Sequence, residues 1–181
     1  MEENTTNTPT TSPVQLGVLF GIIMVLEFVV LYIMDIDPIS NPMIGTIMNT
    51  CNYFVFPVGL IYMVCNAYKK SNFGFISFGE CLKKGVTVCL IGGLIYALFS
   101  VVFNYFFPEF VEEILRKTKA VMIQKSPDMT SEQLEMAMTW TKKFMSPMLI
   151  VPVTLLMFSF IGLIYSLIIG AIVKKDKPQS I

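Results

Sequence analysis

The sequence predicts an all-α, polytopic membrane protein with four transmembrane helices. The first observation is a set of four long apolar stretches, at 15–34, 47–67, 85–107 and 147–173. Each has about the 20 residues that a helix needs to cross a bilayer. The second is composition, because 54% of the residues are hydrophobic and 14% are charged, whereas about a quarter are charged in soluble proteins. Since lipid offers the backbone no hydrogen bonds, each stretch should be helical.

The first stretch should be a retained transmembrane helix and not a cleaved signal peptide. The residues before it include Glu2 and Glu3 but no basic residue, and no small-residue cleavage site follows it. We expect residues 1–14 to be a disordered polar tail and 15–181 to form a single four-helix transmembrane domain. A turn rich in Asp, Asn and Pro, at 35–42, should join the first two helices.

Local signals define the second and third helices. Pro57 removes one backbone hydrogen bond and should kink the second helix near its middle. Ser77 and Glu80 have the spacing of a capping box, in which each side chain bonds the backbone N–H of the other residue. We expect a helix to begin here, to run amphipathically along the surface and to enter the membrane near Gly85.

The segment 108–146 should be an extramembrane helical hairpin between the third and fourth spans. Apolar residues recur at helical spacing on both sides of a break at 126–127, and Thr130 with Gln133 offers a second capping box. The hairpin should either pack on the end of the bundle or lie in the membrane interface, where Trp140 is well placed. Its methionines could fill its underside or form an adaptable binding face.

The charge distribution indicates that both termini are cytoplasmic, because basic residues near the ends of spans favour that side. The second loop and the C-terminal tail contain the lysines Lys69, Lys70, Lys83, Lys84, Lys174, Lys175 and Lys177, whereas the first loop contains none. The third loop has six basic residues matched by six acidic ones. Longer loops translocate despite their charge more readily than short loops do, so the short loops decide the prediction.

Two sequence blocks resemble a known family. At ISFGECLKKG (76–85) and FFPEFVEEI (106–114) the chain resembles the membrane-protein family known as domain of unknown function 4199. The resemblance extends to the Met-rich segment before the last span and to a final apolar helix that ends in lysines. It implies a four-span protein of a bacterial inner membrane with no assigned activity. It also implies a membrane partner, for which a polyprenyl-phosphate glycosyltransferase is a candidate.

Glu27 is the one ionisable residue inside a span, close to the middle of its helix. An intramembrane carboxyl group is costly and marks a candidate functional site. Asn52 in the next, antiparallel helix falls at a similar depth, Asn49 lies one turn nearer the outside, and Asn104 or Tyr53 could join them. This polar cluster could be a structural hydrogen-bonded clamp, a proton or ligand site, or a contact to another protein.

Small residues spaced four apart occupy single faces of three spans, which allows helix backbones to approach closely. These helix-packing residues are Gly17 and Gly21 in the first span, Gly93 and Ala97 in the third, and Gly162, Ser166 and Gly170 in the fourth. We expect most of them to serve packing within the bundle. The alternative is a contact to a second copy or to a partner helix.

The residue inventory argues against an enzyme. Histidine is absent, which removes the usual general base near neutral pH and the commonest metal ligand. The four cysteines have no metal-binding spacing. Thirteen basic residues balance thirteen acidic ones, so no net field attracts nucleic acid. We therefore expect no catalytic residue, no cofactor, no metal and no nucleic-acid partner.

The favoured hypothesis is a non-enzymatic accessory or scaffold protein that binds a membrane partner. The alternative is a small transporter or channel, proton-coupled through Glu27. Four helices leave little room for a pore within one protomer, so the alternative requires an oligomer. Both hypotheses place the chain in a lipid bilayer, with a membrane-protein partner or a second copy of itself.

Overall fold

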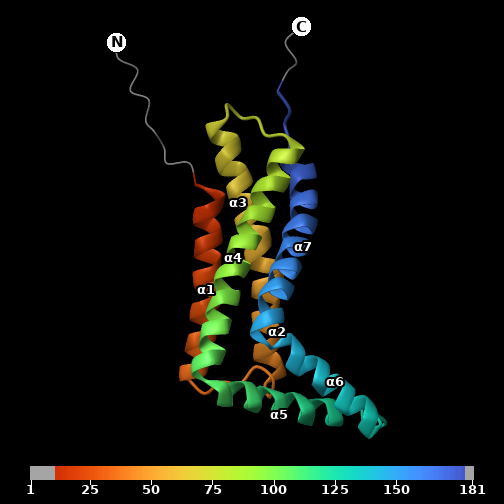
Figure 1. Ribbon diagram of the computed structural model, residues 1–181. Helices are drawn as coiled ribbons and strands as arrows, with labels where there is room; N and C mark the ends of the chain where they lie inside the picture. Colours follow the sequence, from red (N-terminus) through yellow and green to blue (C-terminus); the bar gives the residue numbers. More distant parts are fainter. Residues whose placement is uncertain (1–10, 178–181) are drawn as a thin grey trace, which may run out of the picture.

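The computed structural model describes residues 11–177, and it has four long helices in a bundle with a helical hairpin at one end (Figure 1). The elements are α1 (Pro13–Ile33), α2 (Pro42–Thr50), the π-helical turn η1 (Cys51–Val55), α3 (Phe56–Ser71), α4 (Phe78–Phe106), α5 (Pro108–Lys125), α6 (Ser131–Phe144) and α7 (Pro147–Val173). Four continuous helical segments are long and apolar enough to cross a membrane. The predicted all-α class with four spans and a hairpin is confirmed.

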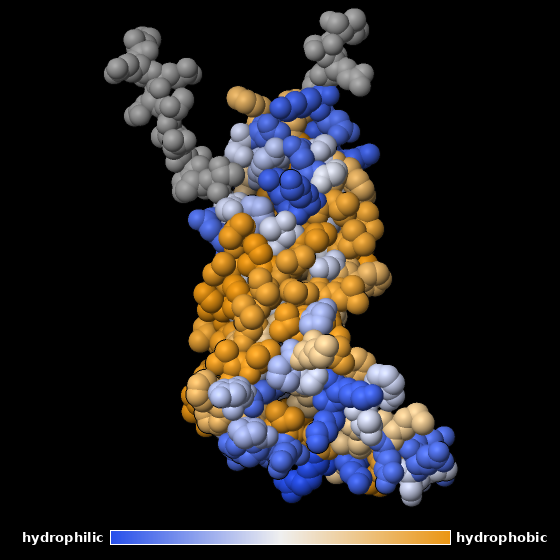
Figure 2. Space-filling view, in the orientation of Figure 1, coloured by the Kyte–Doolittle hydropathy of each residue, from blue (hydrophilic) through white to orange (hydrophobic). Residues whose placement is uncertain are grey.

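The apolar surface has the form expected for a multi-pass membrane protein. Figure 2 shows hydrophilic residues gathered at the two ends of the bundle, with an apolar belt between them. Because lipid solvates this belt, exposed aliphatic and aromatic side chains there carry no penalty. The start of α1 and the end of α7 lie at the same end of the bundle, opposite the hairpin (Figure 1).

Helix α1 begins inside the segment that we expected to be a disordered tail. Ser12 is its N-cap and Pro13 is its first residue. The Ser12 side chain accepts from the Val14 N–H, and Gln15 Oε1 accepts from the Ser12 N–H at 3.0 Å, so this end has its own capping box. Residues 1–10 of the predicted tail lie outside the described residues.

The second span is longer than the apolar stretch that predicted it. It runs without interruption from Pro42 to Ser71 and contains the π-helical turn η1 just before Pro57. Proline has no N–H to donate, so one carbonyl group in the preceding turn loses its usual helical hydrogen bond. In η1 the Phe56 N–H donates to the Cys51 carbonyl, five residues back. The irregularity predicted at Pro57 thus takes the form of a π-helical turn.

Helix α4 lies between α1 and α7, and glycines set the close spacing of the three helices. A methyl group at Gly21 would lie 2.6 Å from Ile95 Cβ, and one at Gly93 would lie 2.9 Å from Phe158 Cβ. Gly92 of α4 receives the ring of Phe20, which the small-residue pattern did not predict. These contacts leave no room for a side chain at the glycine positions.

The other predicted packing residues also face helices of the same chain. Gly17 lies against α4, Gly162 and Gly170 lie against α4 from the α7 side, and Ala97 is fully buried. Ser166 is fully buried opposite Gly85, where an added methyl group would lie 1.9 Å from the Ser166 Oγ. The structure therefore uses these faces for packing inside the bundle.

The capping box at Ser77 opens α4 directly. Glu80 Oε2 accepts from the Ser77 N–H at 2.8 Å, and the Glu80 N–H donates to Ser77 Oγ at 3.3 Å. The helix start predicted at Ser77 is confirmed, and α4 runs without interruption from Phe78 to Phe106. One face of its first turns packs into the core, because Cys81 is fully buried next to Gly170 of α7, while Gly79 and Lys83 are exposed.

Further contacts join the end of α3, the start of α4 and the chain after α7. Tyr68 Oη donates to Glu80 Oε1 at 2.6 Å, and Lys69 Nζ donates to the Val173 carbonyl at 2.8 Å. Ile76, which is fully buried, forms an antiparallel bridge with Lys175. The cap therefore belongs to a cluster that fastens three segments at this end of the bundle.

Replacing Ser77 by alanine should loosen this end without preventing membrane insertion. The change removes an N-cap, which typically costs about 0.5–2 kcal/mol, while the apolar length of α4 is unchanged. Heat-induced unfolding of the purified protein in detergent would measure the loss, and Ser77→Thr, which keeps the hydroxyl, should retain most of the stability. Equal melting temperatures for Ser77→Ala and the parent would show that the cap is energetically unimportant.

Candidate functional site

The hairpin joins the bundle through its first turns and then leaves it. The Phe110 ring of α5 lies 5.4 Å from Phe28 of α1 and 5.1 Å from Phe103 of α4, centroid to centroid. Farther along α5, Lys117, Val121 and Gln124 line a pocket with the first loop and α2, and the far end of the hairpin projects from the bundle (Figure 1). No residue of α5 or α6 is buried. Of the two placements that we expected, packing on the bundle end holds for the start of α5.

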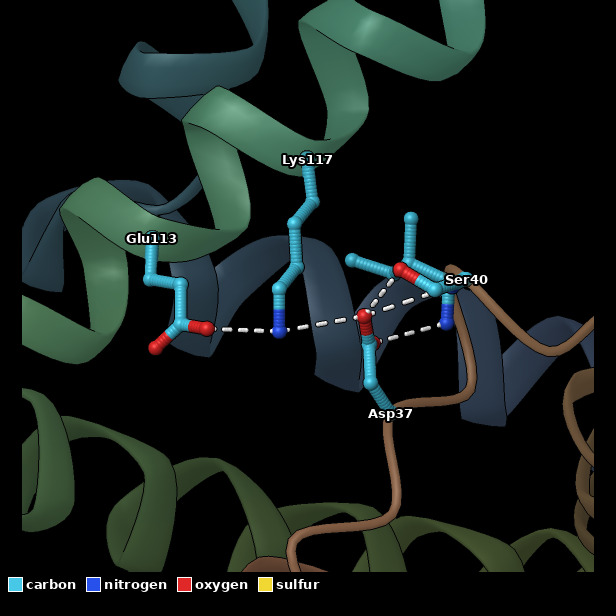
Figure 3. A network of polar contacts seen from close by, with 5 residues as sticks. Asp37, Ser40, Glu113 and Lys117 are labelled. Atoms are coloured by element: carbon cyan, nitrogen blue, oxygen red, sulfur yellow. Dashed lines mark hydrogen bonds and ion pairs between the residues drawn. The ribbon is translucent and has the colours of Figure 1, made fainter.

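A second contact, which the sequence did not predict, fastens α5 to the first loop. Lys117 Nζ lies 3.1 Å from Asp37 Oδ2 and 2.6 Å from Glu113 Oε1, and the Ser40 hydroxyl donates to Asp37 at 2.5 Å (Figure 3). Asp37 and Lys117 are far apart in the chain, so no local pattern indicates their pairing. This network holds the hairpin at a defined angle to the bundle.

The charges of this network support one another. Partial burial disfavours an ionised Asp37, but the hydrogen bonds from Ser40 and the Ile39 N–H, together with Lys117, lower the pKa of the carboxyl group below its usual value. The hydrogen bonds from Lys117 to Glu113 and to Asp37 raise the pKa of the Lys117 ammonium group. Both groups are therefore charged near neutral pH.

The polar cluster expected around Glu27 centres on one hydrogen bond. Asn52 Nδ2 donates to Glu27 Oε2 at 2.7 Å, linking α1 to η1. This is the contact expected from the equal depths of the two residues in antiparallel helices. Both side chains are half-buried, so the pair lies on the flank of the bundle core. The π-helical turn that presents Asn52 is a type of irregularity often found at functional sites.

A cavity lies beside this pair. Its volume is about 320 Å³, and its polar lining comes from Asn49, Asn52, Tyr53 and Tyr96. Asn52 Oδ1 is buried and has no hydrogen-bond partner in the described residues. A buried carbonyl oxygen without a partner costs free energy unless a water or a ligand donates to it. The cavity has room for a small polar molecule beside Asn52.

The membership of the cluster differs from the prediction at two positions. Tyr96 of α4 belongs to it but was not predicted, because tyrosine within a span does not stand out from an apolar pattern. Asn104 lies elsewhere, in a groove between α4 and the hairpin. Phe103 faces the Phe28 ring at 4.8 Å, and a helix turns by about 100° per residue, so Asn104 must face away from Glu27.

Residues 11–177 contain no group of three or more His, Cys, Asp or Glu side chains that could hold a metal ion. All four cysteines are free, and Cys65, Cys81 and Cys89 are buried among apolar side chains. The Glu27–Asn52 pair and the polar residues of the neighbouring cavity offer hydrogen-bonding groups to a ligand. The projecting hairpin offers a second kind of site, a surface for another molecule.

Comparison with known proteins supports one family assignment. No curated protein and no solved structure matches the chain. The family described as "Protein of unknown function (DUF4199)" matches residues 15–175. This match includes all four spans and the hairpin, and it agrees with the resemblance carried by the blocks at 76–85 and 106–114. The chain belongs to this family of proteins of unknown function.

Proposed function

We propose that this multi-pass membrane protein is a non-enzymatic accessory protein that binds a membrane-protein partner through the outer face of α6. One observation carries the proposal: α6 presents a continuous apolar stripe that no part of the described chain covers. Met136, Trp140 and Phe144 recur every four residues and are 58%, 52% and 48% exposed. Such spacing places them on one side of a helix. We call these three residues the α6 stripe.

The composition of the α6 stripe supports a protein partner. Aromatic residues and methionine are enriched in the centres of protein interfaces, and methionine adapts its shape to a partner. A helix that merely adheres to lipid usually has a strongly basic polar face. The hairpin instead carries six basic and six acidic residues, so general attraction to a membrane surface is weak.

Capture of the partner from native membranes would test this proposal. A Met136→Glu/Trp140→Glu double variant should lose a protein that co-purifies with the parent chain in a fixed ratio. The control is Phe73→Glu, which changes an aromatic residue that is 90% exposed at the opposite end of the bundle and outside the α6 stripe. An identical set of co-purifying proteins for the three chains would contradict the proposal.

We further propose that the chain spans a bacterial inner membrane with both termini in the cytoplasm. The lysines at the end of α3 and after α7 lie at one end of the bundle, and the charge-balanced hairpin lies at the other. In intact cells, Ser71→Cys should stay protected from an impermeant thiol reagent, and Asp128→Cys should react, each measured against the parent. Reaction at Ser71→Cys without reaction at Asp128→Cys would invert the orientation.

The second candidate function is a small oligomeric transporter that is proton-coupled through Glu27. The observation that favours it is the cavity lined by Asn52, whose side-chain amide donates to Glu27 at 2.7 Å. Proton flux into liposomes that contain the purified protein should then disappear with Glu27→Gln. Flux that is absent from the parent, or equal in both proteins, would remove this candidate and leave the accessory role unaffected.

A further inference from the structure

A groove opens where the hairpin leaves the bundle. It has a volume of about 1080 Å³ and lies between the last turns of α4, the start of α5, the end of α6 and Pro147 at the start of α7. Its apolar wall includes Val102, Tyr105 and Phe106 of α4, which are 55%, 80% and 69% exposed. These residues end a membrane span, so the mouth of the groove lies at the edge of the hydrocarbon layer.

A basic pocket continues from this groove into the angle between α5 and α6. The pocket has a volume of about 540 Å³ and shares Leu115, Thr139 and Lys142 with the groove. Its charged lining consists of three basic residues, Arg116, Lys119 and Lys142, and one acidic residue, Glu135. The hairpin as a whole is neutral, whereas the groove and the pocket together are lined by four basic residues, Lys143 included, and by two acidic ones, Glu112 and Glu135.

The three basic side chains are available to a ligand. The ion pairs found in residues 11–177 both involve Lys117, which faces the first loop, and none involves Arg116, Lys119 or Lys142. Arginine and lysine are the usual partners of phosphate groups, and arginine can donate two parallel hydrogen bonds to one phosphate. The pocket therefore matches an anionic phosphate group in chemistry as well as in charge.

We propose that the groove and the basic pocket together bind one anionic phospholipid. Its phosphate head group lies between Arg116, Lys119 and Lys142, and an acyl chain lies along Val102 and Tyr105. Two features of this surface indicate an anionic phospholipid as the ligand. The apolar part opens toward the region where acyl chains are the solvent, and the basic part lies just beyond it, at the depth of the head groups. A polar metabolite would leave the apolar wall unmatched, and a neutral lipid would leave the charges unmatched.

This site is independent of the proposed partner. The lipid would occupy the inner angle of the hairpin, whereas the α6 stripe, Met136, Trp140 and Phe144, has no residue in the lining of the groove or the pocket. A bound lipid would also fill the space between α5 and α6 and brace the hairpin against the bundle. Loss of the lipid site would thus leave the apolar stripe in place.

Native mass spectrometry of the full-length protein, purified in detergent with added phosphatidylglycerol or phosphatidylcholine, tests the proposal. One phosphatidylglycerol per chain should be retained, and phosphatidylcholine should not. Arg116→Gln/Lys119→Gln/Lys142→Gln should lower the affinity for phosphatidylglycerol by about 100-fold, since each basic residue near anionic lipid contributes about a fivefold factor. The matched control, Lys70→Gln/Lys83→Gln/Lys125→Gln, removes three exposed charges outside the site and should bind like the parent.

Two further measurements distinguish a lipid site from a site that binds phosphate alone. Val102→Trp fills the apolar wall without changing charge, so it should weaken phosphatidylglycerol binding while the unfolding temperature of the lipid-free protein stays close to that of the parent. Inorganic phosphate in millimolar excess should not displace the lipid, because it makes no use of the apolar wall. Equal retention of the two lipids, equal binding by the two triple variants, or displacement by phosphate alone would overturn the proposal.

Discussion

Glu27→Leu should lower the stability of the purified protein in detergent, whereas Glu27→Gln should leave it nearly unchanged. Leucine leaves the Asn52 amide without its 2.7 Å acceptor, on a residue whose Oδ1 already lacks a partner. An unsatisfied buried polar group costs about 1–3 kcal/mol. Glutamine keeps an acceptor oxygen at the same place. The midpoint of heat-induced unfolding would measure both effects.

A companion variant assigns the effect to the pair. Asn52→Leu removes the donor, so Glu27→Leu/Asn52→Leu should lose less stability than the two single changes added together. A Glu27→Leu protein as heat-stable as the parent would show that the hydrogen bond is not a clamp. In that case the remaining hypothesis for Glu27 would be a role connected with the cavity lined by Asn49 and Asn52.

Gly21→Ala should destabilise the bundle, although alanine is the better helix former. The new methyl group would lie 2.6 Å from Ile95 Cβ and 3.1 Å from the Gly92 carbonyl oxygen. A Cβ atom moves only with its backbone, so α1 and α4 would have to separate along their contact. Overpacking of this kind typically costs about 1–3 kcal/mol. Unfolding in detergent, followed by circular dichroism, should show a lower midpoint.

Gly59→Ala is the matched control, because it makes the same change inside a helix where no atom lies within 4 Å of the new methyl group. This variant should be as stable as the parent or more stable, since glycine is about 0.8–1.0 kcal/mol less favourable than alanine in a helix interior. If both variants shifted the midpoint by the same amount, the close approach of α1 to α4 would have no energetic importance.

The features predicted well from the sequence are those that depend on local pattern. Apolar length located the four spans because a bilayer requires it. The Ser77 capping box is present because its two hydrogen bonds form within one turn. The Glu27–Asn52 contact could be predicted for a different reason. Two antiparallel neighbouring helices bring residues of equal depth together, and few polar residues lie at that depth.

The features missed depend on contacts that join distant parts of the chain. The Asp37–Lys117 pair forms because α5 crosses beneath the first loop, and helix periodicity does not reveal that crossing. The integration of Cys81 into the core also depends on α7, whose Gly170 permits the close approach. Asn104 is excluded from the Glu27 cluster because successive residues of a helix point about 100° apart, and Phe103 is the one that faces Phe28 of α1.

The hairpin angle shows how these long-range contacts create a surface. The Asp37–Lys117 ion pair and the Phe110 ring fix the start of α5, so α6 can return to α7 only along a path outside the bundle. That path leaves the α6 stripe uncovered and opens the groove beneath Val102. The proposed partner surface and the proposed lipid site are both consequences of this one arrangement.

Site-specific photo-crosslinking in native membranes tests the proposed partner surface most directly. A benzophenone amino acid would replace Trp140 in the α6 stripe in one variant and Phe73 at the opposite end of the bundle in another; both aromatic side chains are exposed. We expect a protein adduct of one defined mass at Trp140, formed with a chain other than this protein, and no such adduct at Phe73. Absence of a protein adduct at Trp140, or the same adducts at both positions, would contradict the proposal.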